Sequence, residues 1–393
     1  MEADMSLHPY SARELFDAIV NKDDFVLLDV RNDKDFARFY VEGPHSFPMI
    51  NVSYYDFMEI EEESVARVPR NKPIRIVCAK EGSAKYVGEI LVKHGFTSVG
   101  YLENGIKSWG NVLIPMLLHQ TDDYSLYQFI RPAKASCSYG LIHGKEIMLF
   151  DPSRNIDYYL EFAAQQGCMI SKTFETHLQA DYIAGSRDVA RKTGAVFLAN
   201  DGDFKSSKND YQSLKDGEII CFSTGGPEVR VFFSPGHTPG STSFIIDEQF
   251  LISGDTVFIN SVGRPDLGGQ AEAWAGMLFD SIQKIKKMDQ RLMVLPGHFA
   301  DWAEANDKLL FALPLGEVLK RNQNIYNLAS KEEFTAFIKT NMRPQPEEYA
   351  TIREVNANLI QEDDDKQEIL DLGKNECAAS AYAAQQQAQS IRA

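Results

Sequence analysis

The sequence has no long apolar run. Its richest apolar segment, Val112–Leu118, is far shorter than the ~18 residues that a membrane-spanning helix requires. The first ten residues, MEADMSLHPY, also lack the basic region followed by an apolar region that marks a secretory signal. These absences predict a cytoplasmic protein that does not span a membrane.

Cysteine and positive charge are both scarce. The five cysteines form an odd set without the spacing of a disulfide framework; they stand at positions 78, 137, 168, 221 and 377. This pattern predicts a reduced protein, in which most cysteines are inert parts of the core. The chain has 40 Lys and Arg against 56 Asp and Glu, for a net charge of −16. Such an acidic chain argues against nucleic acid and anionic membrane surfaces as partners.

The chain is long enough for two or three domains. It has 393 residues, of which 44% are hydrophobic and 24% charged, as is usual for a globular protein with a buried core. A mixed stretch that turns polar near Asp122-Asp123 is the best boundary, and the C-terminal end is rich in Ala and Gln. We therefore predict a first domain at 1–118, a linker at 119–123, a second domain with a C-terminal extension at 124–378, and a low-complexity tail at 379–393.

The first domain alternates helical and strand-like segments. Leu7–Asn21 and Ala84–His94 have helical periodicity, whereas the apolar runs Phe25–Val30 and Ile74–Cys78 are typical of buried parallel strands. Alternation of this kind predicts a parallel sheet flanked by helices, with functional sites at the carboxyl ends of its strands.

Cys78 stands at such a strand end. Backbone N–H groups of the following turn, Cys78-Ala79-Lys80-Glu81-Gly82-Ser83, together with the start of the next helix, favour a thiolate or the terminal sulfur of a persulfide. Lys80 would attract an anionic substrate such as thiosulfate. The alternative is that Cys78 is a buried structural cysteine.

Three segments of this domain resemble the rhodanese family: LLDVRNDKDF at 27–36, CAKEGS at 78–83 and YLENGIKSW at 101–109. The resemblance implies a sulfurtransferase in which Cys78 carries a persulfide. Protein phosphatases have a loop of similar shape, but they need an Arg six residues after the cysteine, where this chain has Ala84. Because the loop also lacks the Arg of many rhodaneses, the preferred sulfur donor stays open.

The second domain reads as strands and helices followed by further strands and helices, which predicts two sheets between helical layers. Four turns just beyond strands carry potential metal ligands: His177 in THLQAD, His237 in PGHTPGS, Asp255 in SGDTVF and His298 in PGH. A single loop histidine is usually a polar surface residue. Three histidines and an aspartate in corresponding places indicate a metal site.

These motifs, with GRPDL at 263–267, resemble the metallo-β-lactamase superfamily and specifically its persulfide dioxygenase branch. The resemblance runs from about residue 124 to the segment GKNEC, which ends at Cys377. In the signature H-x-H-x-D-H, this chain has Gln179 and Tyr182 in place of the second and third histidines. The two positions would belong to different sites of a zinc pair, and an amide and a phenol are poor zinc ligands at neutral pH. A dinuclear hydrolase is therefore disfavoured.

The persulfide dioxygenases bind a single iron ion. The resemblance assigns this ion, as Fe(II) with one ion per chain, to His177, His237 and Asp255, a ligand set that leaves positions for O₂ and the persulfide sulfur. Zinc is the alternative metal. Around this set we expect Asp181, His298, Gln179 and Tyr182. We hypothesise that Gln179 bonds to metal-bound water or O₂, and that Tyr182 donates to Asp181 or to the substrate.

Arg264 and Asp266 of the GRPDL motif follow the Asp255 turn closely. The resemblance places both residues near the pocket, with Arg264 paired to a carboxylate or to an anionic substrate. The alternative is a structural ion pair.

The two resemblances together imply a two-domain enzyme of sulfur metabolism. Its α/β fold would join a rhodanese-like parallel sheet to a metallo-β-lactamase αββα sandwich. Its small-molecule partners would be O₂, thiosulfate or sulfite, and a thiol persulfide such as glutathione persulfide, and the family suggests a homo-oligomer. Two alternatives stay open. One is a rhodanese with a metal-poor second domain, and the other is a metal-dependent thioester or lactam hydrolase.

Overall fold

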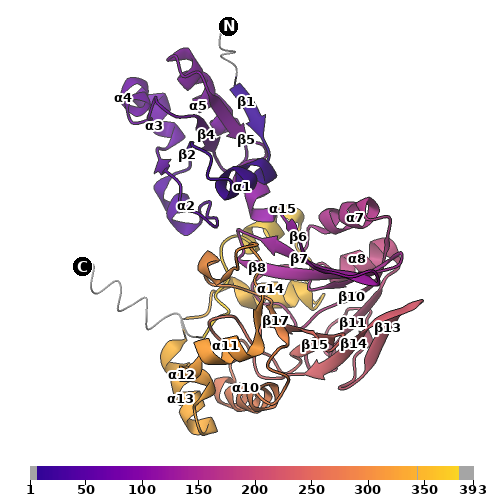
Figure 1. Cartoon of the computed structure of the whole chain (residues 1–393). Coiled ribbons are helices and arrows are strands. Elements are labelled where there is room, and N and C mark those ends of the chain that lie inside the picture. Colours follow the sequence, from indigo (N-terminus) through magenta and orange to yellow (C-terminus); the bar gives the residue numbers. More distant parts are fainter. Residues whose placement is uncertain (1–6, 343, 380–393) are drawn as a thin grey trace. The chain divides into compact units, whose positions relative to one another are not determined.

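The structure of the protein is a computed structural model that describes residues 7–342 and 344–379 (Figure 1). The chain forms two units, the first mainly from residues up to Ile114 and the second mainly from Pro115–Ile130 and Ala135–Asp371. Residues 380–393, which hold nearly all of the predicted low-complexity tail, lie outside the described residues.

The first unit is built on a five-stranded parallel sheet with the order β1-β5-β4-β2-β3. Its strands are β1 (Leu7–Tyr10), β2 (Val26–Asp29), β3 (Met49–Asn51), β4 (Ile74–Val77) and β5 (Val99–Leu102). Its helices are α1 (Ala12–Val20), α2 (Asp33–Arg38), α3 (Tyr54–Glu59), α4 (Glu61–Ala66), α5 (Gly82–Lys93) and α6 (Ile106–Asn111). Leu28 and Ile76 of the sheet share one apolar core with Phe57 and Leu91 of the helices.

The helix predicted from Leu7 begins later. Residues Leu7–Tyr10 instead form β1 and pair with β5, and the helix begins only after Ser11. The Ser11 hydroxyl accepts from the Glu14 backbone N–H while the Glu14 carboxylate accepts from the Ser11 N–H, which is a capping box. This cap fixes the helix start at Ala12, five residues beyond the point suggested by hydrophobic periodicity.

The second unit contains two sheets. The seven-stranded sheet has the order β12-β11-β10-β9-β8-β7-β6, and the six-stranded sheet has the order β13-β14-β15-β16-β17-β18. The first sheet consists of β6 (Ile114–Gln120), β7 (Tyr124–Arg131), β8 (Ser136–His143), β9 (Glu146–Phe150), β10 (Met169–Phe174), β11 (Val196–Ala199) and β12 (Gln212–Ser213). The second consists of β13 (Ile219–Phe222), β14 (Gly225–Phe233), β15 (Thr242–Ile246), β16 (Phe250–Gly254), β17 (Met293–Pro296) and β18 (Leu313–Pro314).

The two sheets meet through aromatic side chains. The Phe150 and Phe174 rings of the first sheet stack with centroids 4.7 Å apart, and each lies 5.2 Å from the Phe244 ring of the second sheet. All three rings are buried, so their contact forms part of the core between the sheets.

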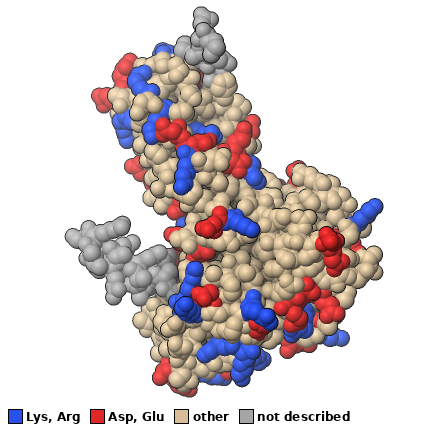
Figure 2. Space-filling view, in the orientation of Figure 1, with Lys and Arg blue, Asp and Glu red and all other residues tan. Residues whose placement is uncertain are grey.

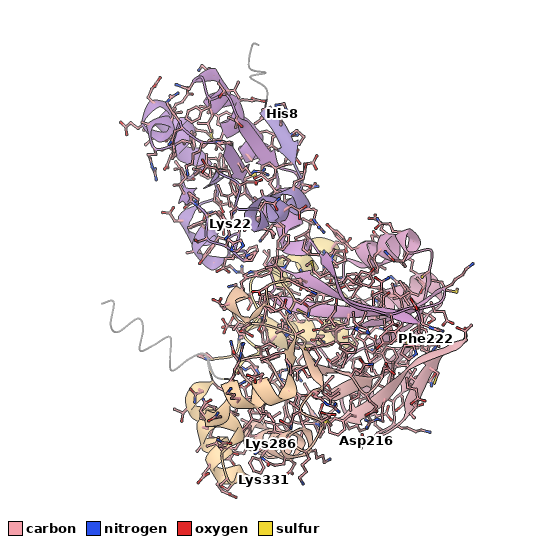
Figure 3. The ribbon with its side chains drawn as sticks, viewed as in Figure 1. His8, Lys22, Asp216, Phe222, Lys286 and Lys331 are labelled. Carbon is pink, nitrogen blue, oxygen red and sulfur yellow. The ribbon has the colours of Figure 1, made fainter. Side chains whose placement is uncertain are left out.

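Helices cover the outer faces of this sandwich. The helices of the unit are α7 (Ile156–Gln165), α8 (Ser186–Thr193), α9 (Asp201–Phe204), α10 (Ala271–Ile285), the 3₁₀ turn η1 (Trp302–Glu304), α11 (Leu315–Arg321), α12 (Gln323–Tyr326), α13 (Lys331–Asn341), α14 (Glu348–Asn356) and α15 (Asp364–Leu370). Helices α7 and α8 pack on β10, whereas α10 and α11 share an apolar core with β16 and β17. The Nζ atom of Lys331 in α13, which is labelled in Figure 3, lies 2.6 Å from the Asp280 carboxylate of α10. This ion pair connects α13 to α10.

A parallel sheet followed by a two-sheet sandwich confirms the α/β fold class predicted from the sequence. The segment predicted as a linker differs in detail. Strand β6 extends to Gln120 and β7 begins at Tyr124, so residues 119–123 hold a strand end and a turn. Pro115 lies within β6. A proline is tolerated there because β6 is an edge strand, where the missing backbone N–H need not pair with a neighbouring strand.

Charged side chains of both signs are interspersed over the face shown in Figure 2. Among the described residues, no helix combines the length and apolar character that crossing a membrane requires.

Candidate functional site

The first candidate site is the loop around Cys78 in the first unit. Cys78 directly follows β4 and is buried, and the Ala84 backbone N–H lies 3.3 Å from its sulfur. The backbone N–H groups of Lys80, Glu81 and Ser83 also surround this sulfur and act to lower its pKa. The loop therefore forms the predicted cradle of backbone donors, and the side chain of Lys80 is exposed on it.

Burial and the cradle act in opposite directions on the Cys78 thiol. Burial raises its pKa, and the surrounding backbone N–H groups offset only part of this rise. The thiol is consequently less acidic than the sequence suggested. The cradle stabilises negative charge on the sulfur without fully compensating for the loss of water.

Gly105 and a buried ion pair support this loop. Gly105 has φ +62°, and a Cβ added there would lie 2.5 Å from the Cys78 carbonyl oxygen, so no other residue fits without displacing the loop. The Ile106 N–H donates to the same carbonyl at 2.8 Å. At the end of β2, the Arg31 guanidinium binds the buried Asp29 carboxylate, with its Nη2 2.6 Å from Oδ2.

The second candidate site lies at the carboxyl ends of strands in the second unit. His177 follows β10, and its Nδ1 lies 2.9 Å from the Thr176 hydroxyl oxygen. Because that hydroxyl donates to the Asp151 carboxylate at 2.8 Å, it accepts from Nδ1–H. Nε2 of His177 is thereby left with a lone pair, and it has no hydrogen-bond partner although it is buried.

His237 has the same arrangement. It stands in the turn after β14, and its Nδ1–H donates to the Arg264 carbonyl at 2.8 Å, leaving Nε2 buried and without a partner. Gly236 precedes it with φ +146°, and a Cβ there would lie 2.3 Å from Cα of Leu278 in α10. The Pro-Gly-His turn therefore needs this glycine to bring His237 close to the helix.

Asp255 meets both histidines. Its Oδ2 lies 3.9 Å from Nε2 of His177 and 3.5 Å from Nε2 of His237, and it too is buried without a hydrogen-bond partner. One donor atom from each of the three residues lies within 4.8 Å of the other two. Each of the three side chains thus has one buried polar atom without a partner among the described residues, and these atoms face one another. The other polar atom of each side chain is hydrogen-bonded to a neighbouring group. This arrangement fits a bound metal ion.

The protonation states also fit a metal ion. Burial lowers the pKa of His177 to about 3 and also lowers the pKa of His237, so both rings are neutral at pH 7. Burial alone would raise the pKa of Asp255, but the neighbouring His298, His177 and His237 hold it below its usual value. Neutral imidazoles and an ionised carboxylate are the forms that bind metals.

His298 lies beside this cluster, after β17. Its Nδ1 is 2.8 Å from Oδ1 of Asp255, and its Nε2 is 2.9 Å from Oδ2 of Asp181. Burial acts against a charge on this ring, but the two carboxylates raise its pKa to about 10. Cys377 joins Asp181 and His298 in a second group of buried donor atoms that all lie within 4.8 Å of one another.

Gln179 and Tyr182 do not replace the histidines that the family signature has at their positions. The Gln179 side chain lies beside the buried carboxyl of Glu175, and its Oε1 is buried without a hydrogen-bond partner among the described residues. The Tyr182 hydroxyl points to the Asp151 carbonyl at 3.4 Å, not to Asp181 as we hypothesised, and its ring packs edge-on against His298. Burial raises the pKa of Tyr182 well above its usual value, so the phenol stays protonated.

Arg264 is held by the protein itself. Its Nε and Nη2 lie 2.6 and 2.8 Å from the two carboxylate oxygens of Asp266, and its Nη1 donates to the Glu376 carbonyl at 3.1 Å. The side chain is only 1% exposed. This geometry favours the structural ion pair over the substrate-binding role, and it connects the GRPDL turn to the C-terminal segment.

Sequence reasoning missed Asp203, which joins two of the ligand loops. Its carboxylate accepts from the Leu178 N–H at 3.0 Å, the Thr238 hydroxyl at 2.6 Å and the Gly240 N–H at 2.7 Å. Leu178 and Thr238 directly follow the two ligand histidines. In the sequence, Asp203 belongs only to a short polar stretch, and nothing there marks it as a neighbour of either histidine.

Two family descriptions match the chain. Residues 11–111 match the rhodanese-like domain, and residues 134–318 match the metallo-beta-lactamase superfamily. A hydroxyacylglutathione hydrolase of Anaeromyxobacter dehalogenans is 34% identical over 189 residues, which are 47% of this chain and 68% of that protein. One from Francisella tularensis subsp. novicida is 28% identical over 227 residues, with 54% and 85% covered.

Solved structures agree with this fold. A metallo-beta-lactamase from Staphylococcus aureus has a TM-score of 0.54 and 28% identity, with 61% of this chain and 75% of that chain covered. The structure of ETHE1 from Myxococcus xanthus has a TM-score of 0.51 and 21% identity, with 59% and 98% covered. At this identity the second likeness concerns the fold alone.

Proposed function

The chain belongs to the metallo-beta-lactamase superfamily and carries a rhodanese-like domain ahead of that fold, and on this premise we propose a persulfide dioxygenase joined to a sulfurtransferase. Its second domain would oxidise a low-molecular-weight thiol persulfide, such as glutathione persulfide, to sulfite. Its first domain would transfer sulfane sulfur through Cys78.

The observation that carries the proposal is the unequal state of the ligand positions. His177, His237 and Asp255 turn unpartnered buried donor atoms toward one another, whereas the Tyr182 hydroxyl bonds to the Asp151 carbonyl and the Gln179 side chain lies beside Glu175. Two imidazoles and one carboxylate form the ligand set of non-haem Fe(II) oxygenases rather than that of a zinc pair. This supports a single iron ion at the three residues.

His177, His237 and Asp255 would hold Fe(II), which would supply the binding and activation of O₂ beside an anionic sulfur substrate. In the overall reaction, glutathione persulfide, O₂ and water give glutathione and sulfurous acid, which ionises to sulfite. The terminal sulfur loses four electrons and O₂ accepts them, so no other oxidant is needed.

The protein supplies orientation and a dry environment. Thr176 and the Arg264 carbonyl fix the two rings so that Nε2 of each faces Asp255. All three ligand side chains are at most 2% exposed, which limits the access of water to a reactive sulfur species.

The first domain would act by nucleophilic exchange. The Cys78 thiolate attacks the outer sulfur of thiosulfate, sulfite leaves with the electron pair of the broken S–S bond, and Cys78 becomes a persulfide. A thiol such as glutathione then takes the outer sulfur and regenerates the thiolate. The backbone N–H groups of the loop would stabilise the negative charge on either sulfur.

The curated relatives favour a second candidate function. They are named hydroxyacylglutathione hydrolases, and a metal-dependent hydrolysis of a glutathione thioester would use the same cluster. Both candidates act on a sulfur substrate linked to glutathione. Substrate binding therefore cannot separate them, and the test must measure whether the substrate is oxidised or hydrolysed.

The test uses the full chain purified without oxygen, reconstituted with Fe(II) or with Zn²⁺, and given glutathione persulfide or hydroxyacylglutathione. We expect O₂ uptake and sulfite from the persulfide with Fe(II) alone. The His237→Ala variant should lose both signals. Thioester hydrolysis by the zinc form without O₂ uptake by the iron form would establish the hydrolase instead.

A further inference from the structure

The second unit contains a cavity of about 750 Å³ at the far end of two strands that lead to the metal ligands. Small-molecule sites in proteins have volumes of roughly 300–1,000 Å³. Phe250 and Met293, the first residues of β16 and β17, pair with each other and line this cavity. Asp255 and His298 follow the opposite ends of the same strands, and a strand of this length spans roughly 15 Å. The cavity is therefore separate from the proposed iron ligands.

The floor of the cavity is apolar. Phe250, Leu292 and Leu310 line it and are each at most 6% exposed. One wall is the edge strand β6, where the ring centroid of His119 lies 5.0 Å from that of Phe250 and 5.3 Å from that of Tyr124. Nε2 of His119 is buried and has no hydrogen-bond partner among the described residues. The inner surface thus suits a ligand with an apolar or aromatic body.

Another wall is a loop that begins at Asn306 and is held by hydrogen bonds. The Asn306 side-chain oxygen accepts from the N–H groups of Lys308 and Leu310 at 2.9 and 3.1 Å. The Phe311 N–H donates to the side-chain oxygen of the buried Gln128 at 2.9 Å. Because this wall is already fixed, a ligand would not have to order it on binding, which lowers the entropic cost of association.

Charged side chains stand on the rim of the cavity. Two acidic ones, Glu248 and Asp289, are already paired with Arg230 and Arg291, with 2.6 Å between the nearest oxygen and nitrogen in each pair. The Asp289 pair uses Nε and Nη2 of Arg291 and leaves Nη1 outside it. Both carboxylates are therefore neutralised by cations of the protein itself.

We propose that this cavity binds a small amphiphile with an apolar or aromatic body and one anionic group, such as a carboxylate. The buried side chains would cover the body, while Lys308 and Nη1 of Arg291 would bind the anion. Lys308 lines the cavity, is exposed, and has no ion-pair partner among the described residues. Asp307 beside it is likewise exposed, so the rim offers two cationic donors against one unpaired carboxylate.

The test is a titration of the full chain with the dye anilinonaphthalene sulfonate, which has an aromatic body and a single anionic group. The dye fluoresces strongly in apolar surroundings, and we expect saturable binding of one dye per chain. Lys308→Glu should weaken this binding roughly fivefold or more, whereas Asp307→Asn should not weaken it. The matched control Lys215→Glu changes an exposed lysine of the same unit outside the cavity and should bind as the wild type does.

Competition then identifies the class of ligand. Octanoate should displace the dye, whereas octylamine, which has the same chain length and is cationic at neutral pH, should not do so at equal concentration. Absence of saturable binding, equal affinity in Lys308→Glu and the wild type, or equal displacement by the two competitors would overturn the proposal.

The site is independent of the function proposed above, because dye binding requires neither iron nor persulfide. His237→Ala should bind the dye as the wild type does. Loss of the dye in this variant would place it at the metal centre and overturn the proposal, whereas O₂ uptake and sulfite formation test the proposed function alone.

Discussion

Two opposing effects act on the pKa of the buried Cys78 thiol, and each can be assigned to particular atoms. Its position after a buried strand removes water, which disfavours the thiolate, while the Ala84 N–H and its neighbours donate to the sulfur. Burial is the larger effect. The cradle is thus suited to stabilising charge during sulfur transfer without generating a strongly reactive thiolate at rest.

This balance predicts the pH dependence of Cys78 alkylation. Only the thiolate reacts with iodoacetamide, and burial raises the pKa of the thiol, so the rate should increase with pH through an apparent pKa above that of an ordinary cysteine. The rate at Cys78 can be followed by mass spectrometry of its peptide, with the exposed Cys221 of the same chain as the internal control. An apparent pKa for Cys78 below that of an ordinary cysteine would contradict this assignment.

At the scale of structural elements, the metal centre depends on loops that are connected to one another. Asp203 of α9 accepts three hydrogen bonds from the loops that carry His177 and His237. Each bond fixes a residue one to three positions from a ligand. The two loops are therefore held at a set separation by one carboxylate that itself contributes no ligand.

Asp203→Ala should consequently weaken metal binding. The three donors lose their partner at a cost of roughly 1–3 kcal/mol each if they remain buried, and loss of such supporting bonds lowers metal affinity about 10–100-fold. The affinity can be measured by competition with a chelator. Asp201→Ala, at an exposed carboxylate of the same short helix, is the control and should bind metal as the wild type does. Equal affinity in all three proteins would rule out this role for Asp203.

Much of this centre could be predicted from the sequence because its main candidate ligands follow strands directly. His177, His237 and Asp255 each follow a strand within four residues, which marks them in the sequence as candidates at strand ends. Cys377 and Asp203 could not be found in this way. Their positions depend on a β-bridge and on side-chain bonds between distant segments, which no local pattern encodes.

The helix start predicted from hydrophobic periodicity at Leu7 was also wrong, because a polar cap determines where this helix begins. The segment from Leu7 has helical spacing, yet Leu7–Tyr10 pairs with β5 and the helix begins only after the Ser11 cap. Pairing in a sheet depends on a partner that is about 90 residues away in this chain, and such tertiary pairing overrides local propensity.

At the scale of the whole molecule, the two candidate sites lie in separate units with their own cores. We expect their chemistries to be separable by mutation. Cys78→Ser should abolish transfer of sulfur from thiosulfate to glutathione and leave O₂ uptake with added glutathione persulfide largely intact. His237→Ala should do the opposite.

The check is to assay both variants for both activities under identical conditions, with the melting temperature as a control for folding. Loss of O₂ uptake in a folded Cys78→Ser variant would show that the dioxygenase reaction requires the Cys78 persulfide. Sulfur transfer that survives Cys78→Ser would show that Cys78 is a structural cysteine.

The most direct measurement for the central claim is the stoichiometry of a single assay. The full chain, prepared without oxygen and containing about one Fe(II) at its His-His-Asp set, receives a known amount of glutathione persulfide in air-saturated buffer. We predict that O₂ is consumed and sulfite formed in equal amounts, and that neither occurs in the iron-free protein. Iron-loaded protein that leaves the persulfide and O₂ unchanged would contradict the proposed function.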